Sequence, residues 1–193
     1  MAAVSVSSEE RIEQSEAATA YVPPSFDEVY EAHVDFLWRS ARALGVRPSA
    51  VDDVLQDVFV VVHRRLAHFE GRASLRTWLA RILVRVIQEH RRRFRRREDH
   101  AELPEEVCDT RDGPLDEVAR GQAAQLLTRI LDGMDEDQRT AFVLAEIEQM
   151  TVPEIAAALE VNVNTIYSRL RLARREYERQ LARVRAKDGW RQP

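Results

Sequence analysis

Cysteine, glycine and proline are scarce in this sequence of 193 residues. The one cysteine, Cys108, excludes an internal disulfide and a cysteine-ligated zinc site. With six glycines and seven prolines, long periodic segments alternate with short polar breaks, which favours helices throughout. The longest apolar run, Val58 to Val62, is far below the roughly 18 residues of a membrane span, and residues 1–16 lack a signal-peptide pattern. We therefore expect a cytoplasmic protein with no direct membrane insertion.

Signatures of catalysis are also missing. The five histidines include no pair at metal-ligand spacing, and the sequence shows no nucleophile–base pattern and no glycine-rich phosphate loop. The sequence therefore predicts no enzyme, no cofactor, no metal site and no small-molecule substrate.

Positive charge is concentrated in two segments. Residues 72–97 hold ten arginines and one acid, and residues 163–185 hold seven arginines and two acids. The formal net charge of the chain is only −4, so the remaining residues are strongly acidic. Two basic segments in an acidic background indicate two separate surfaces for a polyanion. For the first segment taken alone, the alternative is a solvated arginine-rich helix that only keeps the protein soluble.

Apolar periodicity divides the chain into two helical blocks. Residues 1–24 are small, polar and acidic, which predicts a disordered leader. Residues 25–97 form the first block, and residues 98–114, with seven acids and two prolines, form a linker. Residues 115–185 form the second block, followed by a tail of residues 186–193. The predicted fold is all-α, with two small helical domains joined by a flexible acidic linker, the C-terminal one containing a helix-turn-helix.

Capping residues predict where several helices start. Ser74 and Asn162 are predicted N-caps, and three pairs resemble capping boxes: Ser25 with Glu28, Asp135 with Gln138, and Thr151 with Glu154. After Asp135 the apolar spacing continues to Ile147. The arginine-rich helix that follows Ser74 has a predicted apolar stripe of Leu75, Trp78, Leu79, Ile82 and Val86.

The second block contains a helix-turn-helix pattern, in which a short helix from Pro153 to Leu159 precedes a longer one capped by Asn162. The first helix braces the second so that the N-terminal side chains of the second enter the major groove. The alternative is an ordinary helical hairpin, but the basic charge of residues 163–185 favours DNA binding. Outward-facing side chains expected to contact bases and phosphates are Asn162, Asn164, Thr165, Tyr167, Ser168, Arg169, Arg171, Arg174 and Arg175.

Two strings carry a resemblance to a known family: DDVLQDVFVVVHRRLAHFEGRASLRTWLARI, and LDGMDEDQRTAFVLAEIEQMTVPEIAAALEVNVNTIYSRLRLARREYERQL. By their order and spacing the chain resembles the extracytoplasmic-function (ECF) group of bacterial sigma-70-type sigma factors. The resemblance covers residues 25–97, as sigma region 2, and residues 115–182, within a predicted region 4 domain of residues 115–185. It implies a subunit that guides core RNA polymerase to a promoter, melts the minus-ten element with region 2 and recognises the minus-thirty-five element with region 4.

The polar side chains of residues 52–57 alone indicate either a docking surface or solvated polarity. The resemblance implies that this helix docks on the clamp helices of the largest polymerase subunit, and the implied docking residues are Asp52, Asp53, Gln56, Asp57 and Phe59.

The resemblance also implies a second set, which melts the minus-ten element and holds a flipped base. Trapping an unstacked base needs a pocket and a cationic wall. Further implied partners are the polymerase flap and an anti-sigma factor. The minus-ten set consists of Phe69, Gly71, Arg72, Ser74, Trp78, Arg81 and Arg85.

Three positions depart from the usual family pattern. Arg85 stands where the family commonly has an asparagine, Glu160 replaces a frequent turn glycine, and Leu172 occupies a position that is often basic. These departures concern promoter preference more than the general role.

Two alternative functions remain. A sigma-like mimic that only binds an anti-sigma factor would have lost its basic and aromatic residues, which this chain retains. A stand-alone helix-turn-helix regulator would have no use for the first block.

Overall fold

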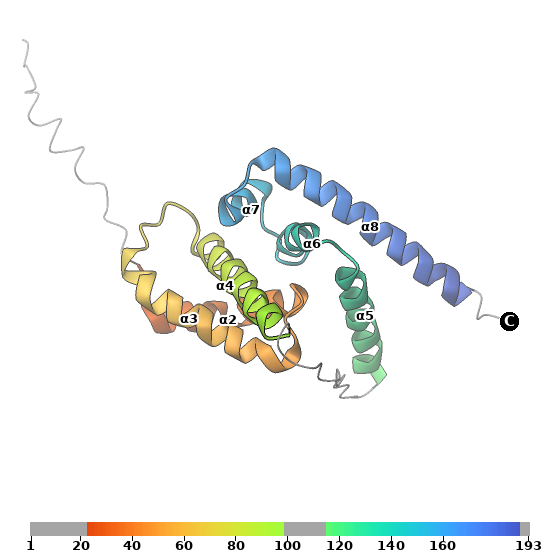
Figure 1. The fold of residues 1–193 in the computed structure, drawn as a ribbon, viewed down its shortest axis with the longest axis horizontal. Helices are drawn as coiled ribbons and strands as arrows, with labels where there is room; N and C mark the ends of the chain where they lie inside the picture. The colour runs from red at the N-terminus through yellow and green to blue at the C-terminus, as the bar shows by residue number, and fades with distance from the viewer. Residues whose placement is uncertain (1–22, 99–114, 190–193) are drawn as a thin grey trace, which may run out of the picture.

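The computed structural model describes residues 23–98 and 115–189, and their regular structure is helical throughout (Figure 1). The N-terminal unit consists of α2 (Phe26–Ala43), α3 (Val51–Arg65) and α4 (Leu75–Glu98), with 3-10 turns η1 (Pro48–Ala50) and η2 (Leu66–His68). The C-terminal unit consists of α5 (Leu115–Asp132), α6 (Glu136–Phe142), the π-turn η3 (Val143–Ile147), α7 (Val152–Leu159) and α8 (Val163–Gly189). The all-α prediction is confirmed. The leader to residue 22, linker residues 99–114 and residues 190–193 lie outside the described residues.

The predicted N-caps are found in the structure. The Ser25 hydroxyl accepts from the Glu28 N–H at 3.3 Å, and the Glu28 carboxylate accepts from the Ser25 N–H at 2.8 Å. The Glu154 carboxylate accepts from both the N–H and the hydroxyl of Thr151, at 2.9 and 2.7 Å. Because these hydrogen bonds stabilise the ionised form, they hold the pKa of Glu28 and of Glu154 below the ordinary value.

Three further helices also start as predicted. The Ser74 hydroxyl caps α4 by accepting from the Thr77 N–H at 3.1 Å. The Asn162 amide oxygen caps α8 by accepting from the Asn164 N–H at 2.8 Å. At the start of α6, the Asp135 carboxylate accepts from the N–H groups of the two residues at N2 and N3, at 3.0 and 3.4 Å.

Helix α4 is buried over more of its surface than the predicted stripe. Leu79 and Ile82 of that stripe are buried, and Leu75, Trp78 and Val86 are partly buried. The reason is that α4 packs against α2 and α3 on one side and against α7 of the C-terminal unit on another (Figure 1). The additional buried apolar residues of α4 are Ala80, Leu83, Val84 and Ile87.

The segment after Asp135 differs from the prediction. The expected helix to Ile147 is regular only to Phe142, and the backbone then widens into a π-turn in which the Glu148 N–H donates to the Val143 carbonyl at 3.0 Å. Gln149 follows with a φ of 54°. This turn reverses the chain ahead of α7 and leaves Glu148 buried.

In the described ranges, no helix is both long and apolar enough to cross a membrane. Nor do these ranges bring together three or more His, Cys, Asp or Glu side chains in a group that could hold a metal ion.

Candidate nucleic-acid interface and docking groove

Helices α7 and α8 form the predicted helix-turn-helix. Ile155 and Ala156 of α7 and Ile166 and Leu170 of α8 are buried in the core. Helix α7 ends at Leu159, and the next residue, Glu160, turns the chain toward α8 with a φ of 56°. The opposite face of α8 is therefore directed outward at its N-terminal end. Asn162, Asn164, Tyr167, Ser168, Arg171 and Arg175 are exposed, and Thr165 is half-buried.

The predicted arginines of α8 fall into two classes. Arg169 forms an ion pair with Asp137 of α6, and Arg174 lies 2.7 Å from a carboxylate oxygen of Glu146. Among the described residues, no acid lies within ion-pair distance of Arg171, and the same holds for Arg175. Arg171 and Arg175 can therefore bind an external anion without first giving up an internal partner.

The connector before α4 and the first turns of α4 enclose a pocket of about 410 Å³. The rings of Phe69 and Trp78 lie 5.1 Å apart in it, and Ser74 caps the helix that carries Trp78. Gly71 has a φ of 70°, a left-handed conformation that glycine adopts easily, and Arg72 is exposed beside it. The lining residues are His68, Phe69, Glu70, Arg72, Ala73, Thr77, Trp78, Arg81 and Ala157.

Two of the predicted minus-ten arginines contact the C-terminal unit. Arg81 donates to the Ala157 carbonyl at 2.5 Å, and its other terminal nitrogen lies 3.4 Å from the Glu160 carboxylate. Arg85 forms an ion pair with the same carboxylate. The pocket that contains Phe69 and Trp78 is therefore bordered by the C-terminal unit along one side, where Ala157 lies.

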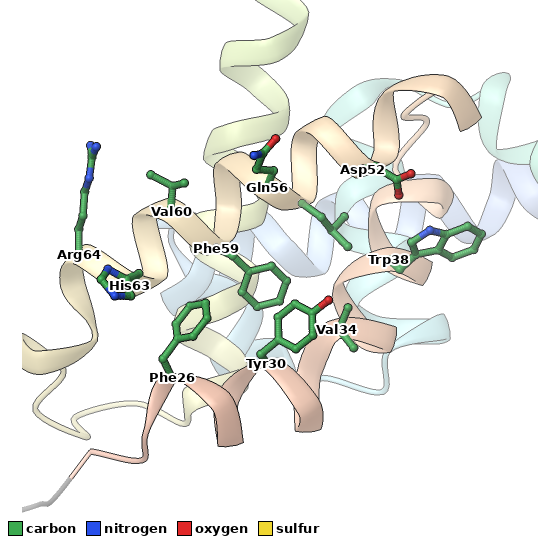
Figure 2. Close-up of a pocket in the computed structure, with 11 residues that line it drawn as sticks. Phe26, Tyr30, Val34, Trp38, Asp52, Gln56, Phe59, Val60, His63 and Arg64 are labelled. Carbon is green, nitrogen blue, oxygen red and sulfur yellow. The ribbon is translucent and has the colours of Figure 1, made fainter.

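A second cavity, an apolar groove of about 770 Å³, runs between α2 and α3 (Figure 2). The ring of Phe59 lies 4.7 Å from that of Tyr30 and 6.0 Å from that of Phe26, so Phe59 belongs to the aromatic wall of the groove. Tyr30 and Trp38 are each 45% exposed. The lining residues are Phe26, Tyr30, Val34, Trp38, Asp52, Leu55, Gln56, Phe59, Val60, His63 and Arg64.

Three of the five predicted docking residues, Asp52, Gln56 and Phe59, line this groove. Asp53 and Asp57 are exposed but do not line it, and Asp57 lies 3.6 Å from Arg93 of α4.

The sequence prediction missed Tyr30 and Trp38 as surface residues. The exposure of Trp38 could have been predicted, because Trp38 does not fit the spacing of the buried residues of α2 and a large apolar side chain outside that spacing is expected at the surface.

The sequence prediction also missed the polar contacts between the two units. Arg76 donates to the Glu148 carboxylate at 2.7 Å and to the Glu148 backbone carbonyl at 2.9 Å. Arg139, which is 7% exposed, donates to the Ala43 carbonyl at 2.7 Å and to the Asp132 carboxylate at 2.8 Å. Burial lowers the pKa of Arg139, and Asp132 partly offsets that effect. No local pattern in the sequence marks these contacts.

Comparison with known proteins gives matches in both units. The family model "Sigma-70 region 2" matches residues 29–98, and the model "Sigma-70, region 4" matches residues 124–176. The chain is 30% identical to RNA polymerase sigma factor CnrH of Cupriavidus metallidurans, over 78% of this chain and 83% of that protein. It is also 30% identical to ECF RNA polymerase sigma factor SigM of Mycobacterium tuberculosis, over 81% of this chain and 77% of that protein.

A solved structure, that of CnrH in complex with the cytosolic domain of CnrY, is similar with a TM-score of 0.61. The sequence identity to it is 27%, and the match covers 81% of this chain and 87% of that one.

Proposed function

This chain belongs to the sigma-70 family of RNA polymerase sigma factors, in the ECF group, and from that membership we propose that it recognises a minus-thirty-five element and melts a minus-ten element. Sigma factors are transcription initiation factors and not enzymes. In the proposal, the region 2 domain comprises residues 25–97 and the region 4 domain residues 115–185. The protein acts in the cytoplasm by guiding core polymerase to its promoters.

Recognition of the minus-thirty-five duplex is assigned to α8. The exposed amide of Asn164, the hydroxyl of Ser168 and the exposed guanidinium of Arg171 supply the donors and acceptors that base edges require. Arg175 lies one turn further along the same helix, where it can neutralise a backbone phosphate.

Melting of the minus-ten element is assigned to the pocket of Phe69 and Trp78. Aromatic rings at the wall of an open pocket can stack on an unpaired base, a contact worth about 1 to 3 kcal/mol per base. Arg72 and Arg81 at the same pocket provide positive charge for the backbone of the separated strand.

Docking on core polymerase is assigned to the groove between α2 and α3. Its aromatic wall is apolar, while Asp52 and Gln56 line it with polar groups and Asp53 lies exposed beside Asp52. An apolar surface with acids beside it suits a helical partner that carries both apolar and basic side chains.

An anti-sigma factor is the further proposed partner. Support comes from the similar structure of CnrH, which was solved as a complex with the cytosolic domain of CnrY.

The observation that carries the proposal is the occurrence of both sigma regions in one chain, each with cationic side chains on a surface of its own. The mimic hypothesis is disfavoured because Trp78 and the arginines remain, and the stand-alone regulator is disfavoured because region 2 is present. The test is run-off transcription with purified core polymerase on promoters found by chromatin mapping of this protein. Transcripts should depend on the protein, and no transcript above core polymerase alone on the enriched sites would reject the proposal.

Two tryptophans of region 2 provide a matched pair for that assay. Trp78→Ala should abolish strand opening, measured by permanganate reactivity, while leaving association with core polymerase intact. Trp38→Ala should weaken association with core polymerase. Equal effects of the two variants on both measurements would contradict the assignment of separate roles.

A further inference from the structure

The N-terminal and C-terminal units pack against each other along α4. Helix α7 lies beside α4, and the π-turn η3 contacts α2 (Figure 1). Buried apolar residues from both units belong to one continuous cluster. The units are therefore in direct contact, a feature that the sequence prediction of two domains joined by a flexible linker did not include.

Polar contacts across this boundary involve the residues assigned to melting. Arg81 and Arg85 both reach the carboxylate of Glu160, and Arg81 also donates to the Ala157 carbonyl. Ala157 in turn borders the pocket that holds Trp78. The C-terminal unit thus covers part of the surface that a separated DNA strand needs.

Glu160 is held in an uncommon conformation. Its φ of 56° lies in the left-handed region, which favours glycine, and its side chain is half exposed. A glycine here would relieve the backbone but could not bind Arg81 or Arg85. A carboxylate at this turn therefore supplies a contact that glycine cannot, namely the ion pairs across the boundary.

The boundary contains buried polar atoms without hydrogen-bond partners. Among the described residues, five buried side-chain atoms lack a hydrogen-bond partner, and four of them belong to residues that pair across it: Arg76 Nε, Arg81 Nε, Arg139 Nη2 and Glu148 Oε1. Each of these atoms is buried in the closed arrangement without a full set of hydrogen-bond partners, which costs free energy. Closure is therefore opposed by incomplete hydrogen bonding and favoured by ion pairs and apolar contact.

The recognition face of α8 remains available in the closed arrangement. Asn164, Tyr167 and Arg171 are exposed, whereas Arg81 and Arg85 are engaged. Closure therefore affects the two DNA-binding surfaces unequally.

We propose that this arrangement is a self-inhibited form of the protein, in which Glu160 occupies Arg81 and Arg85 in place of the phosphates of the minus-ten strand. This inference rests on the proposed function, because it takes α4 as the melting surface. Carboxylate and phosphate oxygens compete for the same guanidinium donors. Binding of the separated strand therefore requires α7 and the Glu160 turn to leave α4.

The test measures the distance between the two units in the full chain. Spin labels are placed at Ala32→Cys of α2 and Ala182→Cys of α8, both exposed positions, in a Cys108→Ser background. Pulsed electron paramagnetic resonance then gives the distance distribution. Glu160→Gly and Arg85→Ala should each raise the ratio of open to closed molecules by up to about fivefold per ion pair lost. Glu178→Gln, which removes an exposed acid on α8, is the matched control and should leave the distribution unchanged.

The second arm adds a single-stranded oligonucleotide with the minus-ten sequence of a mapped promoter. The oligonucleotide should shift the wild-type protein to the open distribution, and Glu160→Gly should bind it about two- to fivefold more tightly, in proportion to the larger open fraction. The inference would be overturned if the distance distributions of Glu160→Gly and Arg85→Ala were identical to that of the control, Glu178→Gln. So would oligonucleotide binding to wild type with no change in distance.

The two arms separate failure of the inference from failure of the proposed function. If the distances respond to Glu160→Gly but no form binds the oligonucleotide, α4 is not a melting surface, and both the melting assignment and the self-inhibition fail. If the oligonucleotide binds all forms equally, the melting assignment stands and the self-inhibition alone fails.

Discussion

Replacement of Arg171 by alanine tests the assignment of α8 most directly. The guanidinium is exposed on the outward face, and among the described residues no acid lies within ion-pair distance of it. Binding to DNA therefore breaks no internal ion pair of Arg171. A bidentate contact to a guanine contributes about 1 to 3 kcal/mol, so Arg171→Ala should weaken binding of the preferred duplex by roughly 5- to 150-fold.

Two other arginines of α8, Arg169 and Arg179, provide comparisons for the expected loss of DNA affinity. Arg169 is paired with Asp137, and an ion pair of this exposure contributes only about 0 to 1 kcal/mol, which must be given up before Arg169 can bind a phosphate. The loss of DNA affinity for Arg169→Ala should be smaller by that amount. Arg179, which pairs with Glu176 further along α8, provides a control variant with little expected effect.

The assay is fluorescence anisotropy of the full chain on duplexes from mapped promoters, with each base pair of the minus-thirty-five element varied in turn. The salt dependence separates base contacts from phosphate contacts. Loss of one phosphate contact lowers the slope of log K against log salt by about 0.9. Arg175→Ala should lower the slope by that amount, and Arg171→Ala should leave the slope unchanged while relaxing preference at one base pair.

A specific result would refute this reasoning. If Arg171→Ala lowers the salt slope and leaves base preference intact, Arg171 contacts a phosphate. The exposed face of α8 would then be rotated relative to the groove from the orientation assumed for it.

Three further predictions concern docking and stability. Asp53→Arg should reduce association with core polymerase in a pull-down while leaving binding of the full chain to minus-thirty-five duplex unchanged; equal loss of both would contradict a docking role. Gly45→Ala should lower the free energy of unfolding by about 1 to 2 kcal/mol, because the φ of 92° disfavours any side chain and the new Cβ would lie 2.7 Å from Arg139. The control is Gly133→Ala, where φ is ordinary and the nearest contact of the new Cβ is 3.4 Å. Equal urea midpoints for the two variants would contradict the prediction. Burial holds the pKa of His33 below its ordinary value of 6.5, so the folded state favours the neutral imidazole. The contribution of His33 to stability is therefore complete above about pH 6.5 and is lost on acidification, because the unfolded chain takes up the proton first. His33→Gln should flatten the dependence of the urea midpoint on pH between about pH 7 and pH 5, and an unchanged pH profile would refute this.

Features set by near neighbours in the chain were predictable from the sequence. Ser25, Ser74 and Thr151 were identified as caps because a cap and its partner are separated by three residues, and the structure confirms each of them. The outward face of α8 was predictable for the same reason, since the short helix before it fixes which side is buried. The DNA contacts of that face stay predictions.

The packing of the two units was not predictable from local patterns. Arg76 and Glu148 are 72 positions apart, and nothing near either residue indicates a partner at that separation. One signal was available in α4, where Ala80, Leu83, Val84 and Ile87 add apolar residues around most of the helix. A helix that is apolar beyond a single stripe is expected to be covered on more than one side.

The π-turn after α6 also escaped the sequence prediction. Apolar spacing continues through it to Ile147, so the pattern gives no reason to end the helix at Phe142. Gln149, with its left-handed backbone, stands where a glycine would have marked the turn. The consequence is a contact between the two units, because this turn brings the buried carboxylate of Glu148 to Arg76.

In the self-inhibited form that we propose, the surface of α4 accepts two anions in turn, the Glu160 carboxylate and the phosphates of DNA, and arginine suits both. A guanidinium presents a planar set of donors that fits both carboxylate and phosphate oxygens, whereas a lysine ammonium binds as a point charge. The pairs of Arg81 and Arg85 with Glu160 are partly exposed, so their contribution to stability is small and readily replaced. A lysine at either position would retain the charge but would lose the paired hydrogen bonds to the incoming phosphates. In the proposal, the weakness of these ion pairs therefore allows a DNA strand to displace them, while the apolar contact between α4 and α7 favours the closed arrangement in the absence of DNA.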